Sequence, residues 1–495
     1  MLCAMKFRLM CGGFLIAMPW LMGATPGPVA QMGSWLVAAG VLAGLLFFQS
    51  ARYWPQSLIV AASLSLCMAV LQFAGLAAGL APWVSESASG EMVANLRQRN
   101  QFATLMVMGA LVVWLRYLSP NADFTPRSAR SIMLAVAISL LAFAAALSGS
   151  RTGLLQWLAL AALAVCWRRS WGANVQWVLG AALLGYGLGA LLGPWLAQAA
   201  GHANAGLLGR AAASDGHSRL ALWSNVIELI SQRPILGHGW RSLAYVHYAQ
   251  DFSSQRFMEM PDNAHNLPLH LAVELGLPIA TAFCGLVAWL IWKNKPWNET
   301  QPARQLAWGV LLMIGIHSLL EYPLWYGSFF MTALICMGIL SQDVWREFKE
   351  KWLLEHANTA QGAIKLGVRC FAVLLLAGTA FVAFDYHRVS QIYLQPEQRS
   401  SWYAADPLGA AKQTVLFQPQ AKFAELQITP LSKETAPRIL ALSSELIHWS
   451  PEPRVIEKLI ESAVMMGLDE LAMFHLQRYR AAYPKAHAIW ACKAL

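Results

Sequence analysis

"PDNAHNLPLHLAVELGLPIATAFCGLVAWLIW", residues 261–292, changes from polar to apolar within a few residues. The run 269–292 is long enough to cross the hydrocarbon core of a bilayer, which takes roughly 20 residues of helix. Asn266 is a suitable N-cap for that helix, and Pro268 suits its first turn. The stretch therefore predicts a helix that enters a membrane directly after a polar loop.

Apolar runs of this kind recur along the chain, which has 495 residues, of which 57% are hydrophobic and 13% charged. The runs lack the two-residue alternation of an outer-membrane barrel. We predict an all-α, polytopic membrane protein with about eleven transmembrane helices, within a range of about ten to twelve. The expected spans are 9–25, 33–50, 57–81, 102–118, 131–148, 153–167, 175–198, 269–292, 306–320, 324–341 and 367–384. Because Pro323 separates 306–320 from 324–341 so closely, that pair is read as two helices or as one re-entrant hairpin.

The distribution of basic residues predicts the orientation of these spans. With the N-terminus in the cytoplasm and its first span kept as an uncleaved helix, the cytoplasmic flanks carry sixteen Lys and Arg. The short outer loops carry three, namely Arg97, Arg99 and Arg151. This bias explains the net charge of +10, so no nucleic-acid partner is expected.

Two polar segments then fall on the outer side of the membrane. The chain divides into a membrane domain, 1–384, and a helical domain, 385–495, with a large outer loop at about 199–268 within the first. The tail carries helical patterns separated by prolines, which resemble stacked hairpins of the tetratricopeptide kind. We expect the tail to bind an acceptor or to brace the outer loop.

Ionisable residues at a membrane boundary are candidates for function, and several gather on the outer face. Arg151 lies in a tight turn between two apolar spans, and Arg219 opens a helix in the outer loop. His265 ends that loop beside Asn266. The next polar residues, His270 and Glu274, are four apart, as an ordinary intrahelical pair would be.

Two further groups complete the candidates. His317, Glu321 and Tyr322 cluster at the outer end of a span, and Gln98 and Gln101 precede another. The eight cysteines form no CxxC pair, and neither an HExxH nor a Walker-type motif is present. The sequence thus gives no support for a metal site or any other cofactor.

Four motifs, in order, resemble the bacterial O-antigen ligase/polymerase superfamily: "SGSRTGLLQ" (148–156), "SRLALW" (218–223), "GHGW" (237–240) and "HNLPLHLAVELGLP" (265–278). "QRNQFA" (98–103), "HSLLEYPLWY" (317–326) and the helical tail are similar to its protein O-oligosaccharyltransferase branch, which glycosylates pilins and other periplasmic proteins. The resemblance covers almost the whole chain. It implies a multi-pass protein of the bacterial inner membrane, with its active site and C-terminal domain in the periplasm.

The resemblance also implies roles for individual residues. Arg151 and Arg219 would hold the pyrophosphate of an undecaprenyl-pyrophosphate-linked oligosaccharide, and His265 would act as base for a Ser or Thr hydroxyl of the acceptor protein. Either Gln98 or Gln101, together with Tyr322, would support the substrates. From their position at the outer membrane boundary, we also expect Asn266, His317 and Glu321 to support substrate binding. A pyrophosphate leaves as an anion that arginines neutralise, whereas a hydroxyl acceptor needs a base, and neutral histidine suits that task. The expected reaction is a single displacement with inversion at the anomeric carbon.

Three other functions remain as alternatives. An O-antigen ligase would pass the same glycan to lipid A core, and a polymerase would extend it. A transporter or flippase would line a pathway with the same charges, but the candidate residues gather at the outer face and not at the midplane. The tail and the "HSLLEYPLWY" stretch favour protein as the acceptor.

Overall fold

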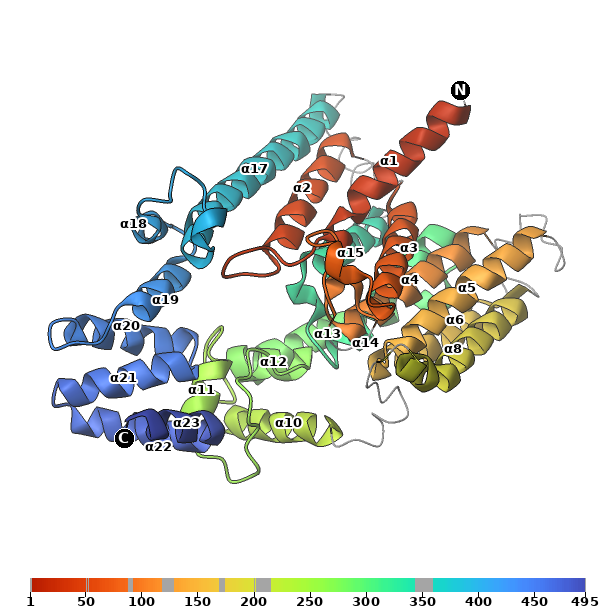
Figure 1. The fold of residues 1–495 in the computed structure, drawn as a ribbon. Coiled ribbons are helices and arrows are strands. Elements are labelled where there is room, and N and C mark those ends of the chain that lie inside the picture. Colours follow the sequence, from red (N-terminus) through yellow and green to blue (C-terminus); the bar gives the residue numbers. More distant parts are fainter. Residues whose placement is uncertain are drawn as a thin grey trace. The chain divides into compact units, whose positions relative to one another are not determined.

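A computed structural model describes residues 2–49, 51, 53–87, 92–117, 129–168, 174–199, 201, 215–342 and 359–494. All regular elements within these ranges are helices, as Figure 1 shows. The first half holds α1 (Leu2–Leu21), α2 (Met32–Phe48), α3 (Trp54–Phe73), α4 (Arg99–Tyr117), α5 (Ala129–Leu147), α6 (Arg151–Cys166), α8 (Asn174–Ala199), α10 (Asp215–Gln232) and α11 (Leu243–Ala249). The second half holds α12 (Leu267–Leu275), α13 (Leu277–Asn294), α14 (Pro302–Ser318), α15 (Gly327–Leu340), α17 (Thr359–Ser390), α18 (Pro407–Lys412), α19 (Gln418–Ile428), α20 (Ala436–Trp449), α21 (Pro453–Met465), α22 (Asp469–Ala482) and α23 (Pro484–Ala494). Short 3-10 turns lie at Ala77–Gly79, Ala94–Leu96, Pro296–Asn298, Pro323–Trp325, Gln391–Tyr393 and Pro396–Gln398.

The apolar helices confirm an all-α polytopic membrane protein. Within the described ranges, four helices are long and apolar enough to cross a bilayer: α3, α8, the segment Leu277–Asn298 and α17. Further apolar helices of 10–17 residues include α2, α5, α6 and α15. Each expected span overlaps a described helix, but 57–81 runs beyond the end of α3 and 269–292 is divided between α12 and α13.

The division falls at Gly276, whose φ of +88° is open to glycine and strained for other residues. A Cβ at this position would lie 2.0 Å from the carbonyl oxygen of Ile235, so the backbone of the preceding loop packs directly against it. The chain therefore turns between α12 and α13, and the membrane-crossing segment begins at Leu277 and not at residue 269.

The chain forms two compact units, and the first contains most of the apolar helices. It comprises Met1–Thr25, Ala30–Ala213 and Ile291–Ala380. In this unit α5 and α8 pack closely, since Cβ atoms at Gly185 and Gly189 would lie 2.1 Å and 2.6 Å from the carbonyl oxygens of Ser139 and Phe143. Small residues at this spacing let two helix backbones approach within a membrane, where packing and not hydrophobicity drives association.

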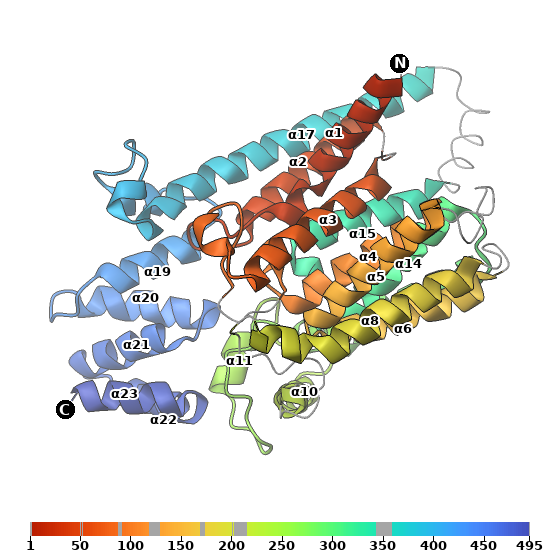
Figure 2. The same ribbon diagram turned by 45° about the vertical axis from the view of Figure 1, so that its right-hand side comes forward.

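The second unit comprises Pro26–Val29, Ser214–Leu290 and Phe381–Leu495. Its tail helices α19 to α22 pack as successive hairpins, visible in Figure 2, around an apolar core. Tyr248 of α11 is 1% exposed and belongs to that core. Its hydroxyl lies 3.1 Å from Nδ1 of His475 on α22. The segment between α8 and α13 is thus braced by the tail.

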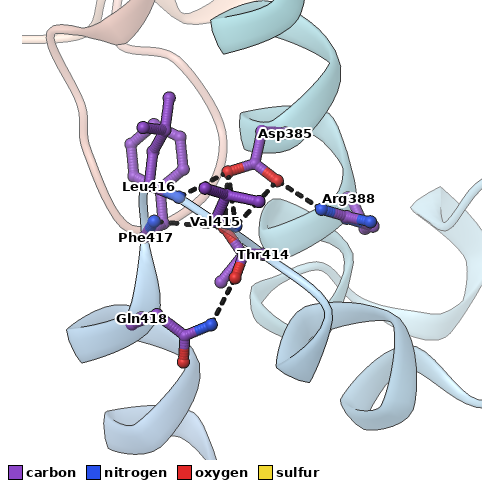
Figure 3. Close-up of polar contacts among 7 residues, drawn as sticks. All are labelled: Asp385, Arg388, Thr414, Val415, Leu416, Phe417 and Gln418. Carbon is purple, nitrogen blue, oxygen red and sulfur yellow. Dashed lines mark hydrogen bonds and ion pairs between the residues drawn. The ribbon is translucent and has the colours of Figure 1, made fainter.

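The start of the tail is fixed by Asp385, near the end of α17 and fully buried (Figure 3). Its carboxylate accepts hydrogen bonds from the backbone N–H groups of Val415 and Leu416 and from the Thr414 hydroxyl, at 2.7–3.0 Å, with Arg388 as its ion-pair partner. The next residue, Tyr386, bonds through its hydroxyl to the backbone of the 26–29 segment. One helix end therefore anchors both the first loop and the tail.

Candidate active site

The loop that carries His265 is held in a constrained conformation within the second unit. His265 has a φ of +50°, a left-handed conformation that is uncommon for residues other than glycine. Its backbone N–H donates to Oδ1 of Asn263 at 2.9 Å, which closes a tight turn. The indole of Trp223 donates to the carbonyl of Ala264 at 3.0 Å. The peptide group that joins Ala264 to His265 is therefore hydrogen-bonded through both its carbonyl and its N–H.

Asn266 occupies the position that the sequence predicts for it. Its side chain accepts from the Leu269 N–H at 3.0 Å, so it is the N-cap of α12, with Pro268 in the first turn. The cap places His265 directly before a helix N-terminus, where the aligned peptide dipoles favour negative charge.

Arg219 lies on α10, one turn before Trp223, so the two side chains share a face of that helix. Because Trp223 contacts the residue preceding His265, this face of α10 is directed toward the His265 loop. The Arg219 side chain is partly exposed. The second unit thus brings Arg219, His265 and Asn266 into one neighbourhood.

His270 and Glu274 form the intrahelical pair that their spacing indicates. Nε2 of His270 lies 3.6 Å from Oε2 of Glu274, and both are almost fully buried. Burial lowers the pKa of His270 to about 4, helped by its electrostatic interaction with His265, and burial raises the pKa of Glu274. Both shifts favour the neutral forms, so this pair is a structural part of α12.

The "GHGW" turn, residues 237–240, closes the C-terminal end of the same helix. The N–H groups of His238 and Gly239 donate to the carbonyls of Val273 and Glu274, each at 2.9 Å. These carbonyls lack partners within α12 because they lie in its last turn. Gly237 is required here, since a Cβ would lie 2.5 Å from the carbonyl of Glu274. The motif therefore fixes the helix that follows His265.

In the first unit, five of the predicted residues line one pocket. Gln98, Gln101, His317, Glu321 and Tyr322 line this small pocket together with Pro323 and Tyr326. Two sequence segments more than 200 residues apart, "QRNQFA" and "HSLLEYPLWY", therefore meet. Amides, a carboxylate and aromatic rings are groups that hydrogen-bond to and stack on neutral sugars.

The two glutamines, which the sequence leaves equivalent, differ in the structure. Oε1 of Gln98 accepts from the backbone N–H of Gln101 at 2.8 Å, so Gln98 caps α4. The Gln101 side chain is 2% exposed and lies within the helix that the cap begins. Gln98 thus has a local structural task that Gln101 does not share.

A buried polar network, which the sequence does not reveal, lies beneath this pocket. Thr104 on α4 bonds to Nδ1 of His317 at 3.1 Å and to Oε1 of Gln156 at 3.0 Å, and Gln156 donates to the carbonyl of Met313. Asn100 and Ser150 continue the network toward α6. The signal for it is weak: Asn100 and Thr104 are four apart on an otherwise apolar helix.

Arg151 is the first residue of α6, and its side chain is exposed. Ser150 is the N-cap, and its Oγ accepts from the Gly153 N–H at 2.9 Å. A guanidinium at a helix N-terminus combines a full charge with free backbone N–H groups, a favourable setting for an anion. Within the described ranges, no three His, Cys, Asp or Glu side chains converge as metal ligands would.

Comparisons with known proteins match three parts of the chain. A family model described as O-antigen ligase matches residues 134–284, which include Arg151, Arg219 and His265. A model described as protein glycosylation ligase matches 93–117, which include both glutamines. A third, described as the C-terminal part of a virulence-factor membrane-bound polymerase, matches 305–494. No solved structure matches the chain.

A curated relative is similar over part of its length. A general O-oligosaccharyltransferase of Acinetobacter baylyi is 26% identical over 231 residues, which cover 45% of this chain and 37% of the relative. The chain therefore matches less than half of that protein. Together, the family models and this relative support the resemblance drawn from the motifs, which is to the O-antigen ligase superfamily and its protein glycosylation ligases.

Proposed function

We propose that the chain is a glycosyltransferase that passes a preassembled oligosaccharide from an undecaprenyl-pyrophosphate carrier to a Ser or Thr hydroxyl of a protein such as a pilin. The reaction takes place at the periplasmic face of the bacterial inner membrane. The membrane domain, 1–384, performs it, and the periplasmic domain, 385–495, braces the loop that carries His265. The similarity to an O-oligosaccharyltransferase supports this substrate class.

The observation that carries the proposal is the conformation of His265. Strained backbone at a polar, partly exposed residue is a cost that folded proteins retain mainly at functional sites. The strain is imposed by groups around it, since Asn263 and Trp223 hold the peptide group that joins Ala264 to His265. His265 removes the proton from the acceptor hydroxyl as the oxygen attacks the anomeric carbon.

The donor is held by arginines in this proposal. As the bond between sugar and pyrophosphate breaks, negative charge grows on the departing phosphate oxygens. Arg219, on the helix face directed at the His265 loop, and Arg151, at the start of α6, neutralise that charge by paired hydrogen bonds. The leaving group needs no proton, so one base suffices. Attack opposite the leaving group inverts the anomeric centre.

The test is transfer by the His265→Ala protein, with His487→Ala in the tail as a matched control. Both variants would be co-expressed with a lipid-linked glycan pathway and a pilin, and the pilin would be analysed by mass spectrometry. We expect His265→Ala to lose about 100-fold or more of the transfer, a typical contribution of a general base. If the His265→Ala protein is correctly inserted and transfer is unchanged, His265 is not the base.

A second candidate function is the ligation or polymerisation of O-antigen. The matches to the O-antigen ligase and membrane-bound polymerase models favour it specifically. The two functions differ only in the acceptor. If the acceptor is a protein, deleting the gene should abolish a glycoprotein band and leave lipopolysaccharide intact. If the chain ligates or polymerises O-antigen, the deletion should truncate the lipopolysaccharide.

A further inference from the structure

Asn100 links the pocket of the first unit to the helix that begins with Arg151. The Ser150 hydroxyl donates to Oδ1 of Asn100 at 2.6 Å, and Nδ2 of Asn100 donates to Oε1 of Glu321 at 3.1 Å. All three side chains are buried, with exposed fractions of 0–7%. Both ends of the amide are therefore hydrogen-bonded: Ser150 donates to Asn100, and Asn100 donates to Glu321.

Only an amide side chain fits this position without adding charge. A carboxylate would accept from Ser150 but would repel Glu321, and an ammonium group would bond Glu321 but could not accept from Ser150. Ser150 in turn accepts from the Gly153 N–H as the N-cap of α6. The bonded series thus runs from a pocket carboxylate to the first turn of the helix on which Arg151 lies.

We propose that Asn100 is a positioning residue: it ties Glu321 to the N-cap of α6 and thereby sets where Arg151 presents its guanidinium to the pyrophosphate of the donor. This inference rests on the proposed function. Asn100 does not touch the donor itself. It acts through Ser150, so its loss changes the geometry of the arginine and leaves the chemistry of the base intact.

The surrounding network separates this role from a general structural one. A second set of hydrogen bonds joins the same helices: Thr104 to His317 of α14, Thr104 to Gln156 of α6, and Gln156 to the backbone of α14. Because α4, α6 and α14 stay connected without Asn100, a change at this residue should misplace the start of α6 and leave the bundle folded.

The decisive substitution is Asn100→Asp, which keeps the shape and the acceptor for Ser150 but sets a second carboxylate against Glu321. Its matched control is Asn298→Asp, the same change at an exposed position. Glu321→Gln and the double variant Asn100→Asp/Glu321→Gln complete the set. In the double variant, the new amide at position 321 can donate to the new carboxylate at position 100. The hydrogen bond between the two positions is thus restored, with the amide and the carboxylate exchanged.

Each variant would be assayed for transfer while the concentrations of lipid-linked oligosaccharide and of acceptor protein are varied separately, and its melting temperature would be recorded. We expect Asn100→Asp to lower kcat/KM for the donor by about tenfold or more, the scale of one hydrogen bond to a charged group. The KM for the acceptor should not change, and the melting temperature should stay close to that of Asn298→Asp. In the Glu321→Gln background the same substitution should cause little further loss.

Two results would overturn the inference while wild-type transfer stands. One is a donor kcat/KM for Asn100→Asp equal to that of the wild type. The other is an equal loss of kcat/KM for the donor and for the acceptor, together with a lowered melting temperature. That result would make Asn100 a structural residue only. A wild-type protein that transfers no glycan under any condition would overturn the proposed function, and this role with it.

Discussion

At the scale of single residues, the backbone of His265 and its imidazole make separate contributions. The left-handed conformation costs any residue other than glycine about 1 kcal/mol or more. The protein accepts that cost at the residue that ends the loop before α12. A substitution that removes the ring can therefore either keep the strain or relieve it.

This difference gives a paired prediction for His265→Ala and His265→Gly. Both variants lack the proposed base and should lose transfer to the same extent. The glycine variant should be more stable than the alanine variant by about 1 kcal/mol, because glycine adopts a φ of +50° without strain. Denaturant unfolding of the purified proteins in detergent measures this. Equal stability of the two variants would show that the residue does not hold this conformation.

At the scale of elements, the break between α12 and α13 is maintained by backbone packing. Gly276 is in contact with the carbonyl of Ile235, and the Leu277 N–H donates to the carbonyl of Pro234 at 2.8 Å. The turn after α10 and the end of α12 therefore form one joint. The position of the His265 loop depends on it, since α12 directly follows that loop.

Gly276→Ala should disrupt this joint. Its Cβ would meet backbone, which cannot move aside easily, and alanine disfavours the left-handed φ, so we expect a loss of about 3 kcal/mol or more. The control is Gly285→Ala on α13, where an added Cβ meets nothing within 4 Å. Thermal unfolding compares the two. If Gly276→Ala melted like Gly285→Ala, the close approach to Ile235 would be refuted.

The contact between α11 and the tail should depend on pH. Burial lowers the pKa of His475 to about 4, aided by the positive charge of His448, whereas the unfolded chain has the ordinary value near 6.5. Between these values the unfolded state binds the extra proton, so acid favours unfolding. The stabilisation is complete above about pH 6.5 and is lost as the pH falls toward 4, by roughly 1.4 kcal/mol per pH unit.

Melting curves at several pH values between 7 and 4.5 test this, with His475→Gln as the comparison. Glutamine keeps a hydrogen-bonding group near the Tyr248 hydroxyl and has no proton to gain, so the slope with pH should be shallower in this variant. Burial also lowers the pKa of His247, to about 3. The difference in slope between the two proteins therefore measures the contribution of His475 alone. Parallel slopes would contradict the prediction.

At the scale of the whole molecule, the proposed orientation predicts which side of the membrane carries the tail. Cys492, on α23, is exposed and accessible to reagents. A membrane-impermeant maleimide applied to spheroplasts should label it if the tail is periplasmic, and Cys492→Ser should lose that label. Labelling that requires lysis of the spheroplasts would place the tail in the cytoplasm and reverse the assigned orientation.

The features that the sequence predicts well are those set by nearby residues. Asn266 as a cap and the His270–Glu274 pair each depend on residues within four positions, and the apolar spans depend on composition alone. The break at Gly276 escapes such a prediction because its cause, the carbonyl of Ile235, lies outside any local pattern. Asn100 and Glu321 are 221 residues apart, so their bond appears only once α4 and α14 are packed together.

The anchoring of the 26–29 segment by Tyr386 has a consequence for biogenesis. Val29 and Tyr386 are separated by 357 residues. At typical rates of 5–20 residues per second, the ribosome therefore makes Val29 about 20–70 s before Tyr386. During that interval the segment that carries His265 has been made, but the tail that buries Tyr248 has not. The second unit is therefore completed only after the tail has been made, and a chaperone at the membrane surface would meet its uncovered apolar residues first.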